Sequence, residues 1–173
     1  MPRRLTTVVL DKTGTLTKGE PRLTDVVVRN GFSEDDLLRL APSAERGSEH
    51  PLGEAIVAGA RHLGLAGPEA FDVPTGRGVV ATVEGRSVLV GSRGLMRDHG
   101  VSEDGLALQL EQLSGEGKTS VLVAVDGEPA GIVAVADTVR EEAGEAVDAL
   151  KKMGLDVAMI TGDIRDRRPR RGA

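Results

Sequence analysis

The sequence predicts an α/β fold in which both ends of the chain form a parallel sheet and an antiparallel α+β domain is inserted between them. Leu5–Leu10 and Leu155–Ile160 are short, continuously apolar runs, which are typical of buried parallel strands. Between them, β-rich runs are joined by short glycine-containing turns, which indicate hairpins. We expect the parallel domain to consist of residues 1–20 and 137–163, the inserted domain of residues 21–136, and a basic disordered tail of residues 164–173.

The first half of the inserted domain is expected to contain one strand and two helices. Leu23–Arg29 has the β-branched residues of a strand. Ser33 is an N-cap residue followed by three acidic residues, which favours a helix through about Glu45. Pro51 is expected in the first turn of a second helix that runs to about Leu63 and ends at a glycine.

Two hairpins and one helix are expected in the second half of the inserted domain. Gly78–Val83 and Ser87–Val90 form the first predicted hairpin, and Ser120–Val125 and Ala130–Ala136 form the second. Val101–Leu113, between them, has the apolar spacing of a helix. A last helix, predicted over Val139–Met153, leads back to the parallel sheet.

Composition narrows the classes of function. The chain lacks cysteine, so it has neither disulfides nor a thiolate metal site, and a reducing compartment such as the cytoplasm is expected. It has two Phe, no Tyr and no Trp, and its formal net charge is −5, which together argue against nucleic-acid binding. Its apolar runs are far shorter than the ~20 residues of a membrane helix.

The run Asp11-Lys12-Thr13-Gly14-Thr15-Leu16-Thr17 directly follows the first predicted strand. Ligands of open parallel sheets bind beyond the carboxyl ends of the strands, and a carboxylate placed there can attack a phosphoryl group. The alternative, an ordinary turn after a strand, would not explain so long a pattern. The run resembles the phosphorylation signature of P-type ATPases.

This resemblance implies a haloacid-dehalogenase-like parallel sheet with an inserted nucleotide-binding domain. It implies Mg²⁺ held by the Asp11 carboxylate and the Thr13 carbonyl, and a phosphoenzyme on Asp11 that persists, because related phosphatases have a second Asp where this chain has Thr13. The segment Asp137–Arg140 resembles the hinge of the same family, although a simple helix start is the alternative. The catalytic residues implied are Asp11, Lys12, Thr161, Gly162 and Asp163.

A second group of residues is similar to the adenine site of heavy-metal P-type ATPases. Glu45, followed by the run Ser48-Glu49-His50-Pro51-Leu52, matches that site and implies ATP contacts by Glu45 and His50. Gly76 and Gly78 resemble the glycine pair beside the nucleotide. A metal site through His50 and Glu54 is the weaker alternative for the histidine, because no third ligand is evident nearby.

One phosphate-loop pattern is rejected. The run Gly115-Glu116-Gly117-Lys118-Thr119 has Gln112 where that loop needs its first glycine, and the predicted helix lies before the run and the strand after it, the reverse of a phosphate loop.

The resemblance ends after Asp163, and an Arg-rich segment replaces the later family motifs that complete the Mg²⁺ site. The parallel sheet is therefore expected to be incomplete, and the activity of this chain is left open. In an intact pump the partners would be an actuator domain and membrane helices carrying a heavy-metal cation, with this region in the cytoplasm and the metal undetermined. A non-catalytic nucleotide-binding module and a soluble phosphatase are the alternatives, and the tail has a further one as a basic arm for nucleic acid or acidic lipid.

Overall fold

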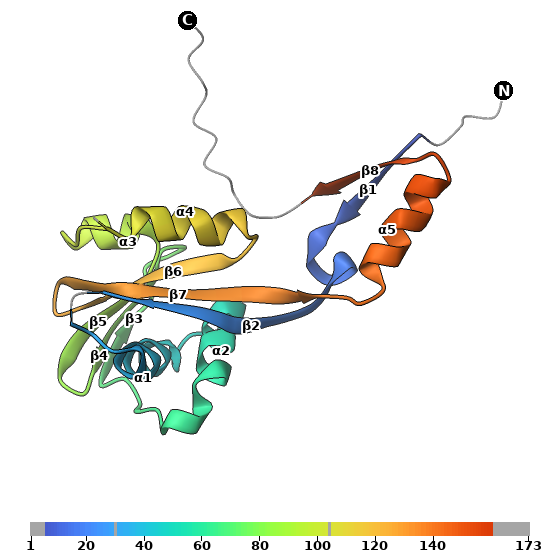
Figure 1. The fold of residues 1–173 in the computed structure, drawn as a ribbon. Coiled ribbons are helices and arrows are strands. Elements are labelled where there is room, and N and C mark those ends of the chain that lie inside the picture. The colour runs from blue at the N-terminus through green and yellow to red at the C-terminus, as the bar shows by residue number, and fades with distance from the viewer. Residues whose placement is uncertain (1–5, 30, 104, 161–173) are drawn as a thin grey trace, which may run out of the picture. The chain divides into compact units, whose positions relative to one another are not determined.

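A two-stranded parallel sheet brings together segments from the two ends of the chain. The computed structural model describes residues 6–29, 31–103 and 105–160. Strand β1 (Thr7–Asp11) pairs in parallel with β8 (Asp156–Ile160), with Asp11 opposite Ile160 at the carboxyl end. A π-helical turn (Lys12–Leu16) follows β1, and helix α5 (Ala143–Lys152) precedes β8 (Figure 1).

The chain divides into two compact units. One contains Met1–Glu20 and Asp137–Ala173, and the other contains Pro21–Ala136. A six-stranded sheet with the order β2-β7-β6-β5-β4-β3 crosses the second unit. Its strands are β2 (Thr17–Val28), β3 (Ala70–Asp72), β4 (Gly78–Val83), β5 (Arg86–Gly91), β6 (Thr119–Val125) and β7 (Glu128–Val139). The predicted fold class is therefore confirmed: a parallel α/β element interrupted by an antiparallel α+β unit.

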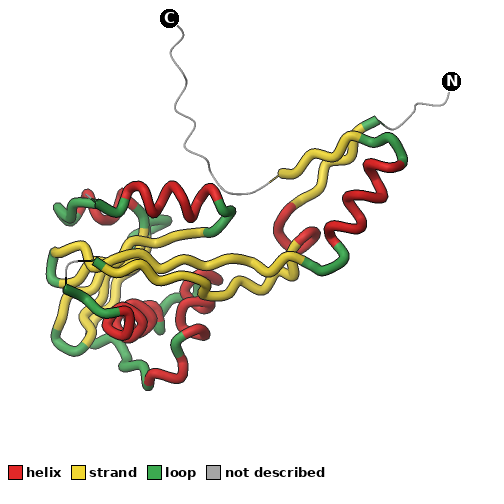
Figure 2. The backbone as a smooth tube through the Cα atoms, viewed as in Figure 1, coloured by secondary structure: helices red, strands yellow, loops and turns green. Residues whose placement is uncertain are grey.

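Helices cover both faces of the six-stranded sheet, as Figures 1 and 2 show. Helices α1 (Glu34–Glu45) and α2 (Pro51–Gly59) pack on one face, and α3 (Arg93–Asp98) and α4 (Ala107–Gly115) pack on the other. Alternate residues of the central strands enter the two cores: Val121 and Val123 face α1 and α2, and Leu122 faces α3 and α4. Because both faces are buried, this sheet forms a rigid base for the residues at the ends of its strands.

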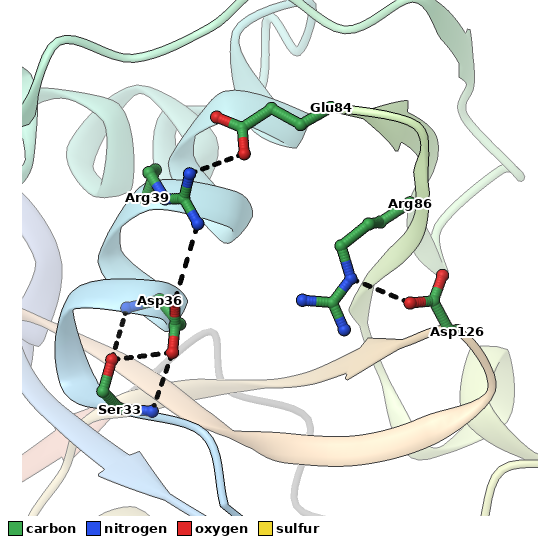
Figure 3. A network of polar contacts seen from close by, with 6 residues as sticks. All are labelled: Ser33, Asp36, Arg39, Glu84, Arg86 and Asp126. Atoms are coloured by element: carbon green, nitrogen blue, oxygen red, sulfur yellow. Dashed lines mark hydrogen bonds and ion pairs between the residues drawn. The ribbon is translucent and has the colours of Figure 1, made fainter.

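Local sequence explains where α1 begins. The Ser33 hydroxyl accepts a hydrogen bond from the Asp36 amide at 3.1 Å, and the Asp36 carboxylate accepts from the Ser33 amide at 3.1 Å (Figure 3). This reciprocal capping box satisfies two amides that the first turn leaves without helical partners. The predicted helix start at Ser33 is thus confirmed, as is the first-turn position of Pro51 in α2.

Several predicted boundaries were wrong. The helix expected over Val101–Leu113 starts only at Ala107, because Gly105 within that range has a φ of 82°, which a helix cannot contain. Val101 is buried although it lies in a loop, so its position matched the apolar spacing of a helix without being part of one. The short elements α3 and β3 were not predicted, and the helix starting at Pro51 ends at Gly59 and is followed by a separate 3₁₀ turn (Arg61–Leu63).

The ends of the parallel unit also differ from expectation. The helix expected from Val139 begins at Ala143, because β7 continues through Val139 and the Arg140 amide donates to the Leu16 carbonyl at 2.9 Å. The two parallel strands were expected to be buried, but Val9 is 53% exposed and Ile160 is 61% exposed. Over the described residues, the sheet has two strands with α5 beside them, too few to cover both faces.

Candidate functional site

Asp11 is the last residue of β1, and its side chain is exposed at the carboxyl end of the parallel sheet. Lys12 and Thr13 follow it in the π-helical turn. An exposed carboxylate at a strand end is accessible to a phosphoryl donor, as the sequence predicts for Asp11. The other residues predicted for this site, Thr161, Gly162 and Asp163, lie outside the described residues, as does the predicted tail.

The segment after Asp11 is held by Asp137. The hydroxyl of Thr17, a residue that is 1% exposed, donates to the Asp137 carboxylate, and that carboxylate also accepts from the amides of Gly19 at 3.2 Å and Glu20 at 3.0 Å. Arg140 adds a bond from its Nε to the Thr17 carbonyl at 3.0 Å. The predicted hinge segment Asp137–Arg140 is therefore tied to the strand that leads away from the run Asp11–Thr17.

The donor set at Asp11 fits magnesium. Mg²⁺ prefers hard oxygen ligands and is usually held by one or two carboxylates, with waters and substrate phosphates completing its octahedron. The Asp11 carboxylate and the backbone carbonyl of Thr13, two residues later, are oxygen donors of that type. Both belong to the strand end and its following turn, so the chain offers them from adjacent positions.

A cavity of about 260 Å³ lies in the second unit. Its apolar lining comes mainly from sheet residues such as Val79, Val90 and Val121, while Glu45, Ser48 and His50 supply polar groups from the end of α1 and the start of α2. A mostly apolar concavity with a few converging polar groups is typical of small-molecule sites. The structure thus brings the two predicted adenine contacts, Glu45 and His50, to the same cavity.

Glu45 is the buried acid of this cavity. The residue is 6% exposed, and burial raises the pKa of its carboxyl above the ordinary value of 4.5, while a hydrogen bond with Ser48 partly offsets that rise. A Cβ placed on Gly53 would come within 3.0 Å of the Ser48 hydroxyl and closer still to the Glu45 carboxylate. Gly53 therefore leaves the space that the Glu45 carboxylate occupies.

His50 is the N-cap residue of α2. Its Nδ1 accepts a hydrogen bond from the Leu52 amide at 3.2 Å, and its own amide donates to the Ser48 hydroxyl at 3.3 Å. A neutral imidazole whose Nδ1 accepts carries its proton on Nε2, so the other edge of the ring is a donor. His50 thus caps α2, and the same residue also lines the cavity.

The predicted glycine pair shapes the rim of the cavity. Gly76 has φ of 68°, and a Cβ placed on it would meet no atom within 4 Å, so backbone conformation rather than space explains the glycine there. A Cβ on Gly78 would lie 2.5 Å from the Gly91 Cα and closer still to the Val90 carbonyl. Gly78 thus permits the close approach of β4 to β5, and both glycines line the cavity.

Gly53, Arg77 and Val121 line the cavity but were not predicted as site residues. Arg77 lies between Gly76 and Gly78, which were predicted, so its position in the sequence could have identified it as a site residue. Gly53 and Val121 are brought to the cavity only by tertiary packing. Ser92 also lines the cavity and caps α3 by accepting from the Leu95 amide at 3.3 Å.

The run around Lys118 does not have the order of elements that a phosphate loop requires. Helix α4 ends at Gly115 and β6 begins at Thr119, so the rejection of a phosphate loop there is correct. Lys118 pairs instead with Asp25 at 2.8 Å and Glu116 at 2.7 Å. In the part of the chain that the structure describes, no three histidine, aspartate or glutamate side chains gather as a metal site requires, which leaves His50 and Glu54 without further ligands.

No helix within residues 6–29, 31–103 and 105–160 is both long and apolar enough to cross a bilayer.

The chain is similar in sequence to a known hydrolase family and to curated transporters. Residues 5–171 match the haloacid dehalogenase-like hydrolase family. The copper-exporting P-type ATPase of Bacillus subtilis (strain 168) is 53% identical over 164 residues, which cover 94% of this chain and 20% of that protein. The chain therefore spans about a fifth of the length of this curated relative.

Solved structures of transporters and of a separate domain are also similar to the chain. A zinc-transporting PIB-type ATPase in its E2.Pi state matches with a TM-score of 0.76 and 38% identity, over 92% of this chain and 26% of that chain. The N-domain of HMA6, a copper-transporting P-type ATPase, matches with a TM-score of 0.58 and 30% identity, over 68% of this chain and 99% of that chain. Both structures share at least 30% sequence identity with the chain, so the similarity is one of sequence as well as of fold.

Proposed function

This chain belongs to the haloacid dehalogenase-like hydrolase family and matches the catalytic region of heavy-metal P-type ATPases, and on that premise we propose that it binds ATP and forms an aspartyl phosphate on Asp11. The observation that carries the proposal is the cavity in which the buried Glu45 and the helix-capping His50 converge. It occurs in the same chain as an exposed nucleophilic carboxylate at a strand end.

The proposed reaction is a phosphoryl transfer. A carboxylate oxygen of Asp11 forms a bond to the γ-phosphorus of ATP, the bond from that phosphorus to the β–γ bridging oxygen breaks, and ADP leaves with the bonding electrons. The product is an acyl phosphate. Thr13 occupies the position two residues later, where a carboxylic acid would assist hydrolysis, so the chain lacks that proton-transfer group and the intermediate should persist.

Magnesium, when bound by the Asp11 carboxylate and the Thr13 carbonyl, would supply neutralisation of phosphate charge. We assign Lys12 to the same catalytic group, together with Thr161, Gly162 and Asp163. The bond between Thr17 and Asp137 supports these roles by fixing the chain directly after the signature. A fixed backbone keeps the nucleophile in place and lowers the entropic cost of reaching the reactive geometry.

We assign recognition of the nucleotide base to the second unit. The Nε2 proton of a neutral His50 can donate to a ring nitrogen of adenine, and the buried Glu45 carboxyl can accept from the exocyclic amine. A buried polar group discriminates between ligands more strongly than an exposed one. A ligand that leaves the buried group without a hydrogen-bond partner incurs the full desolvation free energy of that group. Gly76 and Gly78 complete the lining of this cavity.

In the intact transporter we propose that this region lies in the cytoplasm and works with an actuator domain and with membrane helices that carry a heavy-metal cation. The relatives are named for copper and zinc transport, which supports that class of cargo. The chain covers about a fifth of its curated relative, so transport itself belongs to the longer protein.

Labelling with γ-phosphate-labelled ATP and Mg²⁺ tests the proposal. An acid-stable, hydroxylamine-sensitive label should appear on the wild-type chain and be lost in Asp11→Asn. Asp148→Asn, which changes an exposed aspartate in α5, should keep the label and serves as the matched control. A label retained by Asp11→Asn would refute the assignment of the nucleophile. ATP binding without labelling would favour a non-catalytic nucleotide-binding module, and rapid phosphate release from simple monoesters would favour a phosphatase.

A further inference from the structure

The cavity of the second unit has an uneven distribution of charge. Among the described residues that line it, Arg77 is the one lysine or arginine. The acidic group, Glu45, comes from the end of α1, whereas Arg77 comes from the turn that leads into β4. A nucleotide also has two ends of different chemistry, an uncharged base and an anionic phosphate chain, so the two ends of the site need different partners.

The backbone of Arg77 is held by hydrogen bonds, whereas its side chain is half exposed. The Arg77 amide donates to the Pro74 carbonyl at 3.0 Å, and the Arg77 carbonyl accepts from the Ser92 amide at 2.8 Å. The neighbouring Gly78 packs against β5 with no room for a side chain. The Arg77 side chain, in contrast, is 49% exposed, so it can change rotamer without moving the rim of the cavity.

The partner of Arg77 in this structure is Asp98. The guanidinium forms an ion pair with the carboxylate of Asp98, the last residue of α3, which is 50% exposed. Ion pairs at such exposure contribute little to stability, because water screens both charges and two long side chains lose freedom. A guanidinium matches the oxygens of phosphate as well as those of a carboxylate and binds either in a bidentate manner.

We propose that Arg77 contacts the phosphate chain of the bound nucleotide and that Asp98 competes for the same guanidinium when no nucleotide is present. The inference rests on the proposed function and adds an orientation to it. The base lies towards Glu45 and His50, and the phosphates lie towards Arg77, because a carboxylate repels phosphate and a guanidinium attracts it. Arg77 thereby determines how strongly the site prefers ATP to its nucleoside.

The preference for phosphate gives a direct test. Calorimetric titration of the full chain with ATP and with adenosine should show tighter binding of ATP. Arg77→Gln keeps a polar side chain of similar length without the charge, and should weaken ATP binding about three- to tenfold, a size that allows for solvent screening, while leaving adenosine affinity unchanged. The loss should shrink at high salt, because the contact is partly exposed.

Arg86→Gln is the matched control. Arg86 is 39% exposed and pairs through Nε with Asp126 at 2.8 Å (Figure 3). It belongs to the same unit and is not among the described residues that line the cavity. This variant therefore removes a similarly exposed, ion-paired arginine. ATP and adenosine affinities should both stay at their wild-type values in it.

Asp98→Asn tests whether Arg77 contacts phosphate or only forms a structural ion pair with Asp98. Removing the competitor frees the guanidinium, so ATP affinity should rise about twofold to threefold while adenosine affinity stays constant. If Asp98→Asn instead weakens ATP binding as Arg77→Gln does, the pair only holds the rim and the inference is overturned.

Two further outcomes separate this inference from the proposed function. If the wild type binds ATP and Arg77→Gln binds it equally well, the phosphate contact is refuted while nucleotide binding stands. If the wild type binds neither ATP nor adenosine, the proposed function and the inference fall together.

Discussion

The hydroxyl of Thr17 donates a hydrogen bond to the carboxylate of Asp137, and this bond joins residues separated by most of the chain. The same carboxylate accepts the amides of Gly19 and Glu20, so it holds the strand leaving the signature at three points. Thr17 is the last residue of the signature and Asp137 the first of the predicted hinge. Their contact gives a structural reason for both motifs to occur in one chain.

Thr17→Val should destabilise the unit that contains Asp11. Valine has nearly the same shape but removes the hydroxyl, which donates to the Asp137 carboxylate and accepts from the Gly14 amide at 3.1 Å. Hydrogen bonds to charged groups are worth about 1.5–3 kcal/mol. Urea denaturation should show that loss, and the Gly19 and Glu20 amides should exchange hydrogen faster. Thr15→Val, at an exposed position of the turn that precedes Thr17, is the control and should change neither quantity. Equal effects of the two variants would contradict the role of the bond.

Gly78→Ala should lower the free energy of unfolding by about 2–4 kcal/mol, because the added methyl group meets the backbone of β5 at a residue whose φ of 134° disfavours side chains. The backbone of two paired strands cannot shift without breaking their ladder. Thermal denaturation measures the effect. Gly67→Ala, where a Cβ meets no atom within 4 Å, should stay near wild type. A tolerant Gly78→Ala would show that β4 and β5 can separate at this point.

Glu45→Gln should make stability less dependent on pH. Burial raises the pKa of the folded-state Glu45 carboxyl, so its protonated form favours folding. That contribution is complete below the ordinary pKa of 4.5 and is lost as pH rises through the raised folded-state value. Glutamine does not ionise, so the free energy of unfolding of the variant should rise relative to that of the wild type as pH rises above 4.5, and denaturation at a series of pH values measures this.

The same substitution should weaken ATP binding, because the neutral amide oxygen of glutamine is a weaker acceptor for the adenine amine than a carboxylate. A variant that is relatively more stable at neutral pH yet binds less tightly is the pattern expected of a residue kept for function. Parallel pH profiles for wild type and variant would argue that Glu45 is solvated in the folded chain.

Two substitutions separate the roles of His50. His50→Asn keeps an N-cap acceptor for the Leu52 amide but removes the ring, whereas His50→Ala removes both. ATP affinity should fall in both variants, and stability should fall by about 0.5–1 kcal/mol only in the alanine variant. Calorimetry and thermal denaturation measure the two effects. His62→Asn, an exposed histidine in the 3₁₀ turn, is the control for the general effect of losing an imidazole. Unchanged ATP affinity in His50→Asn would refute the adenine contact.

Local patterns were enough to predict the elements whose signals lie within a few residues. The start of α1 follows from Ser33 and the acidic residue three positions later, and the hairpin of β4 and β5 follows from alternating valines around a glycine turn. The strand that delivers Asp11 follows from a short apolar run ending in a carboxylate. In each case one segment of sequence contains both the element and its boundary.

Features that depend on distant segments could not be predicted. Val101 has the spacing of a helical residue, yet two positive-φ glycines hold it in a loop, and the core it enters decides its burial. Gly53 is explained only by the Glu45 carboxylate beside it, and the pairing of Arg77 with Asp98 only by the packing of α3. The sequence predicted Glu45, His50, Gly76 and Gly78 as nucleotide contacts, and that role stays a prediction. That Arg77 lines the same cavity required the structure.

The adjacency of β2 and β7 in one sheet means that the polypeptide leaves the parallel unit and returns to it along neighbouring paths. The inserted region consequently imposes little loop-closure entropy on its host, since its two ends are already joined by backbone hydrogen bonds. A tight turn between residues near Glu20 and Asp137 could therefore replace the whole insertion. The isolated unit Pro21–Ala136 would in turn have its two termini side by side.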